Sequence, residues 1–397
     1  MTLRRADAIL RSIERREVAF AERRCPVYGF PMDLPSPPPR PRPLLPGEPA
    51  PWFRAKAIGG SDNYVFDTAA GRYILLLFFG RARDDGAAEA LACVERHRAL
   101  FDDRQACFFG VTSDPEDAEA GRVAQQLPGI RFFLDPAGDL AGVFGAGEGG
   151  SERRHWLIVD PMLRAVGAFP IEAGEAAVAG LRSAMAHMPR PDWAPVLMAP
   201  NVLEPALCER LIAHHRETGG ELSGFMREVN GKTTLVTDPQ HKMRRDREIT
   251  DEALCGTLRH RILTRLVPLV KRSFQFEATR MERYIVGRYE AGAGHFRPHR
   301  DNTTKGTAHR RFAVTINLNS GDYDGGDLRF PEYGARTYRA PTGGAVVFSC
   351  SLLHEATPVT RGARYAFLPF LYDDAAARQR EENNPHLAEG VGAYKAG

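Results

Sequence analysis

Two proline-rich stretches divide the sequence. The first is PMDLPSPPPRPRPLLPGEPAP (Pro31–Pro51) and the second is HMPRPDWAPVLMAPN (His187–Asn201). Because proline fixes φ and lacks an amide donor, neither stretch is expected to form a helix or a central strand. The second stretch lies close to the middle of the 397 residues, where a boundary between two domains is expected. The sequence therefore predicts a short N-terminal segment followed by two folded domains.

This division gives five expected segments. They are an N-terminal helix with a proline-rich linker over 1–44, a first domain over 45–186, a linker over 187–200, a second domain over 201–376, and a C-terminal tail over 377–397.

Composition narrows the class of protein. With 43% hydrophobic and 26% charged residues, the chain is typical of soluble globular proteins. A net charge of +3 is too small to predict a nucleic-acid or membrane partner. The arginines of MTLRRADAILRSIERREVAFAERR favour an amphipathic helix over a signal peptide, so we expect a cytoplasmic protein. The six cysteines form no C-x-x-C pair, which favours reduced thiols.

The first domain alternates apolar strand patterns with helical ones. YILLLFFG and ACFFGVTS are typical of buried strands, and AAEALACVERHRALFDD and PEDAEAGRVAQQL have helical spacing. The segments PGEPAPWF, YILLLFFG, FFGVTSDPED, FFLDPAGDLAGVFG and HWLIVDPMLRAVGAF resemble the peroxiredoxin branch of the thioredoxin-like fold. The resemblance implies an α/β domain with helices flanking a sheet.

The residue that gives peroxiredoxins their chemistry is missing. The loop after YILLLFFG is GRARDDGAAEA, which has no cysteine where the family places a thiolate at a helix N-terminus. Cys93 lies further along the helix and fits a buried core cysteine. We therefore expect a redoxin fold without peroxidase chemistry, which serves as a docking or structural module and could hold a homo-oligomer together.

The second domain begins with helices and continues with short strands. NVLEPALCERLIAHHRETGG, with Asn201 as its cap, and DEALCGTLRHRILTRLVPLVKRSF have helical spacing. The stretch HKMRRDREITD (His241–Asp251) fits an exposed helix or loop, with a substrate lid as the alternative. After Phe276, evenly spaced short apolar segments predict an antiparallel sandwich or jelly roll.

HFRPHRDN contains a candidate metal site. His299 and Asp301 are two residues apart in an extended segment, so both side chains can face the same way. His354 ends the apolar strand in FSCSLLHEATPV and offers a third ligand, although a histidine there also fits a purely structural role. Two histidines and one carboxylate make the facial triad that holds Fe(II) with open positions.

Arg364 lies ten residues after His354, in the apolar strand ARYAFLPFLY. A buried guanidinium is costly unless a carboxylate pairs with it, and that strand contains no obvious partner. A dicarboxylate cosubstrate that binds iron at one end and arginine at the other would supply the missing charge.

Together these residues resemble the 2-oxoglutarate- and Fe(II)-dependent oxygenases, and within them the prolyl 4-hydroxylase-like branch. The matching segments are RYEAGAGHFRPHRDN, RRFAVTINLNSGDYDGGDLRFPEYG and GGAVVFSCSLLHEATPVTRGARYAF. The resemblance implies a double-stranded β-helix (jelly roll) with N-terminal packing helices. By position, it implies that His299, Asp301 and His354 hold iron.

The same resemblance assigns the cosubstrate. It implies that Arg364 binds the far carboxylate of 2-oxoglutarate, with ascorbate as an accessory reductant. Collagen-type relatives have lysine where Arg364 stands, a departure that affects affinity and subfamily more than chemistry. Tyr289 matches a tyrosine that hydrogen-bonds the cosubstrate in relatives, but it also fits a strand aromatic in the core.

The expected activity is hydroxylation of an unactivated C–H bond, with dioxygen as co-reactant and succinate as by-product. The presence of Asp301 favours hydroxylation over halogenation. The resemblance suggests a free amino acid, a peptide or a protein as substrate. Two alternatives stay open: a thiol peroxidase acting through Cys93, and a non-catalytic binding protein.

Overall fold

A computed structural model describes residues 42–146, 154–188 and 193–396. By compactness the chain divides into Met1–Leu34 and Pro35–Gly397. The predicted N-terminal helix and most of the first proline-rich stretch lie outside the described residues. Within the described ranges, no helix combines the length and the apolar character needed to cross a membrane.

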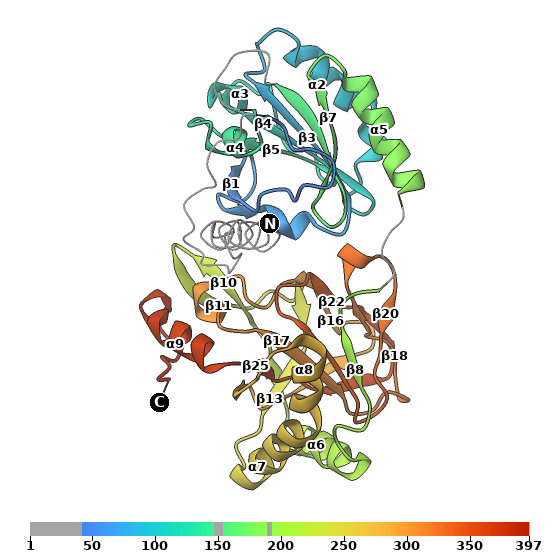
Figure 1. Cartoon of the computed structure of the whole chain (residues 1–397), viewed down its shortest axis with the longest axis vertical. Coiled ribbons are helices and arrows are strands. Elements are labelled where there is room, and N and C mark those ends of the chain that lie inside the picture. Colours follow the sequence, from blue (N-terminus) through green and yellow to red (C-terminus); the bar gives the residue numbers. More distant parts are fainter. Residues whose placement is uncertain (1–41, 147–153, 189–192, 397) are drawn as a thin grey trace, which may run out of the picture. The chain divides into compact units, whose positions relative to one another are not determined.

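The first half of the compact unit is built on a seven-stranded mixed sheet of order β2-β1-β5-β4-β3-β6-β7 (Figure 1). Its strands are β1 (Arg54–Ala57), β2 (Tyr64–Val65), β3 (Tyr73–Gly80), β4 (Ala106–Thr112), β5 (Ile130–Leu134), β6 (His155–Val159) and β7 (Ala165–Pro170). β3 pairs in parallel with β4, and β4 in parallel with β5. The predicted apolar strands are therefore the central ones, as expected of runs that are buried on both faces.

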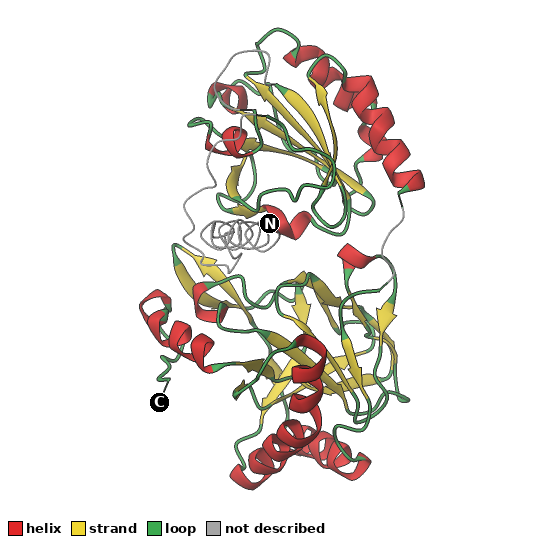
Figure 2. Ribbon diagram, viewed as in Figure 1, coloured by secondary structure: helices red, strands yellow, loops and turns green. Residues whose placement is uncertain are grey.

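Helices cover both faces of this sheet (Figure 2). They are α2 (Ala87–Arg96), α3 (Glu116–Glu119), α4 (Asp139–Val143) and α5 (Gly174–His187). The odd-numbered residues of β3 pack against α2 and α5, and the even-numbered ones pack on the side of α4. This α/β arrangement is the one the alternating pattern predicted.

The predicted helix over PEDAEAGRVAQQL was wrong in its length. Only α3 forms, because Gly121 has a φ of +67° and ends the helical path. Asp117 is held by tertiary contacts, accepting hydrogen bonds from Thr112 at 2.6 Å and Arg122 at 2.7 Å. Local spacing could not show these partners.

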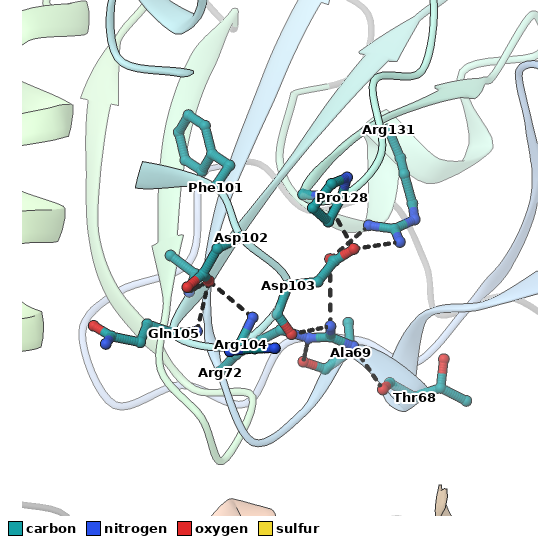
Figure 3. A network of polar contacts seen from close by, with 12 residues as sticks. Thr68, Ala69, Arg72, Phe101, Asp102, Asp103, Arg104, Gln105, Pro128 and Arg131 are labelled. Atoms are coloured by element: carbon teal, nitrogen blue, oxygen red, sulfur yellow. Dashed lines mark hydrogen bonds and ion pairs between the residues drawn. The ribbon is translucent and has the colours of Figure 1, made fainter. Parts of the chain in front are cut away.

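The half-buried carboxylate of Asp103 connects the loop before β4 to β5 (Figure 3). Asp103, with a left-handed φ of 61°, accepts two hydrogen bonds of 2.7 Å from Arg131 and one of 3.3 Å from Arg72. Burial opposes ionisation of Asp103, but the Arg131 guanidinium outweighs it and holds the pKa of the carboxyl below its ordinary value. The network links β5 to the loop before β4 and stabilises the domain.

The second half contains two larger antiparallel sheets. The nine-stranded one comprises β8 (Leu197–Ala199), β9 (Glu221–Leu222), β13 (Arg245–Glu248), β14 (Arg280–Glu282), β15 (Ile285–Glu290), β17 (Phe312–Asn317), β21 (Ala345–Ser349), β24 (Ala363–Phe367) and β25 (Phe370–Tyr372). The five-stranded one comprises β12 (Lys242–Met243), β16 (His295–His299), β19 (Leu328–Arg329), β20 (Thr337–Tyr338) and β22 (His354–Ala356). Two small ribbons join β10 (Phe225–Val229) to β11 (Lys232–Val236) and β18 (Asp324–Gly325) to β23 (Val359–Arg361). The predicted short strands therefore form antiparallel sheets.

The helices of this half are α6 (Pro205–Thr218), α7 (Glu252–Arg261), α8 (Val267–Phe274) and α9 (Asp374–Glu382), with a π-helical turn at Ile262–Leu266 between α7 and α8. The first three pack in one apolar core with the nine-stranded sheet. Short 3-10 helices lie at Phe66–Ala69, Arg98–Leu100, Lys305–Thr307, Pro331–Tyr333 and Asn384–His386.

Three details differ from the sequence expectations. Asn201 does not cap α6, because Glu204 occupies the N-cap position and Asn201 has a φ of +56°. β8 lies inside the expected linker and pairs with β21, so this part of the linker belongs to the sheet. α9 crosses residue 376, where the tail was expected to begin.

The prediction of an exposed helix or loop over His241–Asp251 was wrong. The stretch forms β12 and β13, and it buries Lys242 and Arg244 at 2% and 5% exposure. Arg244 can be buried because Asp246 pairs with it.

Candidate metal and cosubstrate site

The side chains of three predicted site residues lie close together. The ligand atoms of His299, Asp301 and His354 all lie within 4.8 Å of one another. Asp301 Oδ1 is 3.6 Å from His299 Nε2, and its Oδ2 is 3.3 Å from His354 Nε2. One small cation could therefore contact both imidazoles and the carboxylate, which is a donor set suited to Fe(II).

Strand pairing brings the two histidines together. His299 ends β16, His354 begins β22, and the two are directly opposite across the pair. Asp301 follows β16 and is anchored by its backbone amide, which donates to the Cys350 carbonyl at 3.0 Å. The five-stranded sheet thus supplies all three side chains.

The orientation of both imidazoles is fixed by backbone hydrogen bonds. His299 Nδ1 lies 2.7 Å from the Arg297 carbonyl, and His354 Nδ1 lies 3.0 Å from the Leu352 carbonyl. A carbonyl can only accept, so in the neutral ring each Nδ1 carries the proton and each Nε2 keeps its lone pair. The lone pairs are therefore available to a metal at the side of Asp301.

The charges of the cluster suit metal binding. Burial, and then the neighbouring His354, lower the pKa of His299 to about 4. Burial opposes the charge of Asp301, but His354 and His299 outweigh it and hold the pKa of the carboxyl well below its ordinary range. Neutral imidazole and ionised carboxylate are the forms that bind metals.

Arg364 and Tyr289 line the same cavity as the three potential ligands. The two residues are direct partners across β24 and β15, and the Arg364 guanidinium carbon lies 5.1 Å from the centre of the Tyr289 ring. Thr315 and Phe348 also line it.

Arg364 lacks a charged partner among the described residues. It is 2% exposed, its Nη2 donates to Asn317 Oδ1 at 3.3 Å, and its buried Nε has no hydrogen-bond partner within the described ranges. A buried guanidinium with an unused donor fits a ligand carboxylate. The carboxylate at the far end of 2-oxoglutarate is a ligand group of this kind.

Sequence reasoning missed Glu332, which connects the segment of His299 and Asp301 to the segment of His354. Glu332 binds the Arg300 guanidinium at 2.9 Å and accepts from the Leu353 amide at 2.9 Å. Arg300 lies between His299 and Asp301, and its Nε also donates to Asp67 at 3.0 Å. Only the tertiary structure places Glu332 beside both segments.

The cavity wall contains two arginines that sequence reasoning also missed, Arg244 and Arg283. The Arg244 Nη1 donates to the Tyr289 hydroxyl at 3.2 Å.

The thiol that the peroxidase alternative requires, Cys93, is poorly suited to that role. Cys93 is buried, and burial followed by the nearby Glu175 raises the pKa of the thiol to about 11. Cys93, His97 and Glu175 also form a second group of potential metal ligands in the described part of the chain. However, Arg96 already pairs with the Glu175 carboxylate at 2.9 Å.

Comparisons with known proteins agree with this geometry. Residues 284–372 match the family model of the 2OG-Fe(II) oxygenase superfamily. A PKHD-type hydroxylase from Cupriavidus metallidurans is 41% identical over 91 residues, which cover 21% of this chain and 40% of that protein. The chain thus spans about 40% of the length of the curated relatives it matches.

Two solved structures show a limited similarity to parts of the chain. A Pseudomonas putida prolyl-4-hydroxylase gives a TM-score of 0.33 at 20% identity and covers 45% of this chain and 93% of that chain. A peroxidoxin from Mycobacterium tuberculosis gives a TM-score of 0.29 at 19% identity and covers 35% of this chain and 97% of that chain. Since both scores are low, the assignment depends on the family match. The resemblance predicted for the second domain is confirmed over residues 284–372, which match the 2OG-Fe(II) oxygenase superfamily.

Proposed function

We propose that the chain is an Fe(II)- and 2-oxoglutarate-dependent dioxygenase that hydroxylates an unactivated C–H bond of a free or peptidyl amino acid. The observation that carries this proposal is one cavity that holds both a His299–Asp301–His354 cluster and the unpaired Arg364. A metal chelate and a cationic anchor at opposite ends suit a short dicarboxylate.

In this proposal His299, Asp301 and His354 hold the metal and Arg364 binds the far carboxylate of 2-oxoglutarate. Tyr289 lies between Arg244 and Arg364, where its hydroxyl can orient the cosubstrate. When bound, ferrous iron with 2-oxoglutarate supplies the oxidation: the cosubstrate loses carbon dioxide to give succinate, and one oxygen atom enters the C–H bond.

The fold and the substrate class belong to the same proposal. The two antiparallel sheets that supply the cluster and Arg364 support a double-stranded β-helix with N-terminal packing helices. The family match and the PKHD-type relatives support a prolyl-hydroxylase-like activity on an amino acid, peptide or protein. The first domain then serves as a structural or docking module.

The test is iron-dependent turnover of 2-oxoglutarate. Purified chain with Fe(II), 2-oxoglutarate, ascorbate and dioxygen should release succinate, and a lysate or peptide pool that contains the substrate should accelerate this release. Asp301→Ala should abolish the release, whereas His260→Ala, an exposed histidine on α7, should leave it intact. Absence of succinate under every condition would favour the non-catalytic binding protein.

A further inference from the structure

Arg244 and Arg283 lie on the wall of the proposed catalytic cavity, together with His299, Asp301 and His354. Arg244 lies directly before β13 and Arg283 lies between β14 and β15. Both are therefore set on the large sheet, like Arg364 on β24.

Tyr289 lies beside two of these cations. The guanidinium carbons of Arg244 and Arg364 lie 5.6 Å and 5.1 Å from the centre of its ring. The cavity wall therefore carries positive charge at Arg244 and Arg283 in addition to the proposed cosubstrate anchor at Arg364.

The cluster around Arg244 contains more positive than negative charge. Asp246 is bound by Arg244 through both oxygens, at 2.5 Å and 2.7 Å. The second of these oxygens also accepts from Ser223 at 2.5 Å, and Arg283 reaches it only at 3.4 Å. Lys242 is buried nearby and donates to Ser223 Oγ and the Gly224 carbonyl. Arg244 and Arg283 thus share the Asp246 carboxylate, while the contacts of Lys242 are with uncharged oxygens.

Arg283 is less well compensated by Asp246 than Arg244 is. Its distance to Asp246 exceeds that of a strong charge-assisted hydrogen bond. Burial, and then the nearby Arg244, lower the pKa of Arg283 to about 10, as expected of a guanidinium among other cations. An anion placed in the cavity would relieve this repulsion.

The backbone of Arg283 is strained. Its φ is +66°, in the left-handed region that side chains other than glycine, asparagine and aspartate rarely adopt. Its guanidinium lies 5.5 Å from the centre of the Phe370 ring, which also lines the cavity. Strain of this kind collects at binding sites, where the side chain is needed at one place.

We propose that Arg283, supported by Arg244, binds a carboxylate of the substrate beside the metal. This inference rests on the proposed function, in which the two carboxylates of 2-oxoglutarate go to the metal and to Arg364. Neither carboxylate of the cosubstrate is then available to pair with Arg283. The substrate class is a carboxylate-bearing amino acid or peptide, whose anion is either a free α-carboxylate or an acidic side chain.

The experiment compares acids with their neutral amides. Protein loaded with Mn(II) and N-oxalylglycine, an inert analogue of 2-oxoglutarate, is titrated with acetate and acetamide, with l-proline and l-prolinamide, and with acetyl-Pro-Glu-amide and acetyl-Pro-Gln-amide. Binding is measured by calorimetry, and the paramagnetic relaxation of probe protons reports proximity to the metal. The second pair tests the α-carboxylate and the third tests the acidic side chain.

We expect at least one acid to bind about tenfold tighter than its amide. Arg283→Gln should remove this preference, Arg283→Lys should restore part of it, and Arg272→Gln, an exposed arginine on α8, should leave it unchanged. Equal binding of acids and amides, no binding of any acid, or a preference that survives in Arg283→Gln would overturn the proposal.

Two further outcomes distinguish failure of the substrate proposal from failure of the proposed function. If Arg283→Gln weakens N-oxalylglycine more than it weakens the acids, the arginine belongs to the cosubstrate site and the proposal is wrong. If the chain neither binds Mn(II) nor consumes 2-oxoglutarate, the proposed function fails. The acid preference is then measured on the metal-free protein, where its absence also overturns the substrate proposal.

Discussion

His299 and His354 are direct partners across β16 and β22, and each holds its ring by a hydrogen bond from Nδ1 to the carbonyl two residues earlier. The same local contact thus orients both imidazoles, and both Nε2 atoms face Asp301. Strand pairing sets the distance between the rings, and the backbone sets their tautomer.

Arg364 should contribute to cosubstrate affinity and not to stability. Replacement by glutamine removes a charge-assisted contact with the 2-oxoglutarate carboxylate, so the Kd for 2-oxoglutarate should rise about tenfold or more. Because its buried charge has no carboxylate partner among the described residues, the free energy of unfolding of Arg364→Gln should stay equal or rise. Calorimetry and urea unfolding measure the two quantities. An unchanged Kd would show that the cosubstrate binds elsewhere.

Glu332 should influence the metal without touching it. It holds Arg300 and the Leu353 amide, which are neighbours of the proposed ligands. Glu332→Gln should lower the affinity for Mn(II) about tenfold, as other outer contacts of metal sites do. Titration followed by electron paramagnetic resonance provides the measurement, with exposed Glu277→Gln as control. Equal affinity in both variants would mean that Glu332 has no positioning role.

Asp246 should give an acid-dependent stability. Burial opposes its charge, but Arg244 outweighs burial and holds the pKa of the carboxyl far below the ordinary 3.8. A depressed folded pKa means that the stabilisation is fully present above about pH 4 and is lost as the pH falls below it. At pH 7, Asp246→Asn should lower the free energy of unfolding by about 3 kcal/mol, because it leaves Arg244 buried without a counter-charge.

Urea unfolding at pH 7 and pH 3 measures this effect. The difference between wild type and Asp246→Asn should be smaller at pH 3, whereas exposed Asp322→Asn should change little at either pH. A difference that grows at pH 3 would contradict the pairing of Asp246 with Arg244.

The sequence predicts features that are local. β3 and β4 could be placed because a continuous apolar run is typical of a strand buried on both faces. His299 and Asp301 could be paired because residues two apart on a strand share a face. The position of Arg364 in an apolar strand signalled a missing carboxylate.

The remaining parts of the site depend on contacts between distant segments. Tyr289 and Arg364 are neighbours because β15 and β24 pair, and no local pattern specifies that register. The charges around Arg244 favoured an exposed segment, since only the folded chain places Asp246 and the cavity beside this arginine. The pairing of distant strands therefore determines those parts of the site that residue spacing along the sequence could not predict.

Cys93 should resist oxidation in the native protein. With the pKa of the thiol raised to about 11, the thiolate fraction at pH 7 is on the order of one in ten thousand. After peroxide and dimedone treatment, mass spectrometry should find no adduct at Cys93 in native protein, whereas the thiol should react with iodoacetamide after unfolding in urea. A sulfenic acid adduct in the native protein would restore the thiol peroxidase hypothesis.

The central claim is that His299, Asp301 and His354 hold one metal ion. Anaerobic titration with Fe(II), followed by metal analysis after desalting, should give one ion per chain in wild type and in His260→Ala. His299→Ala, Asp301→Ala and His354→Ala should each lower the affinity at least about 100-fold, because each removes a ligand. If all three variants bound iron as tightly as wild type, the metal site would lie elsewhere and the account would be wrong.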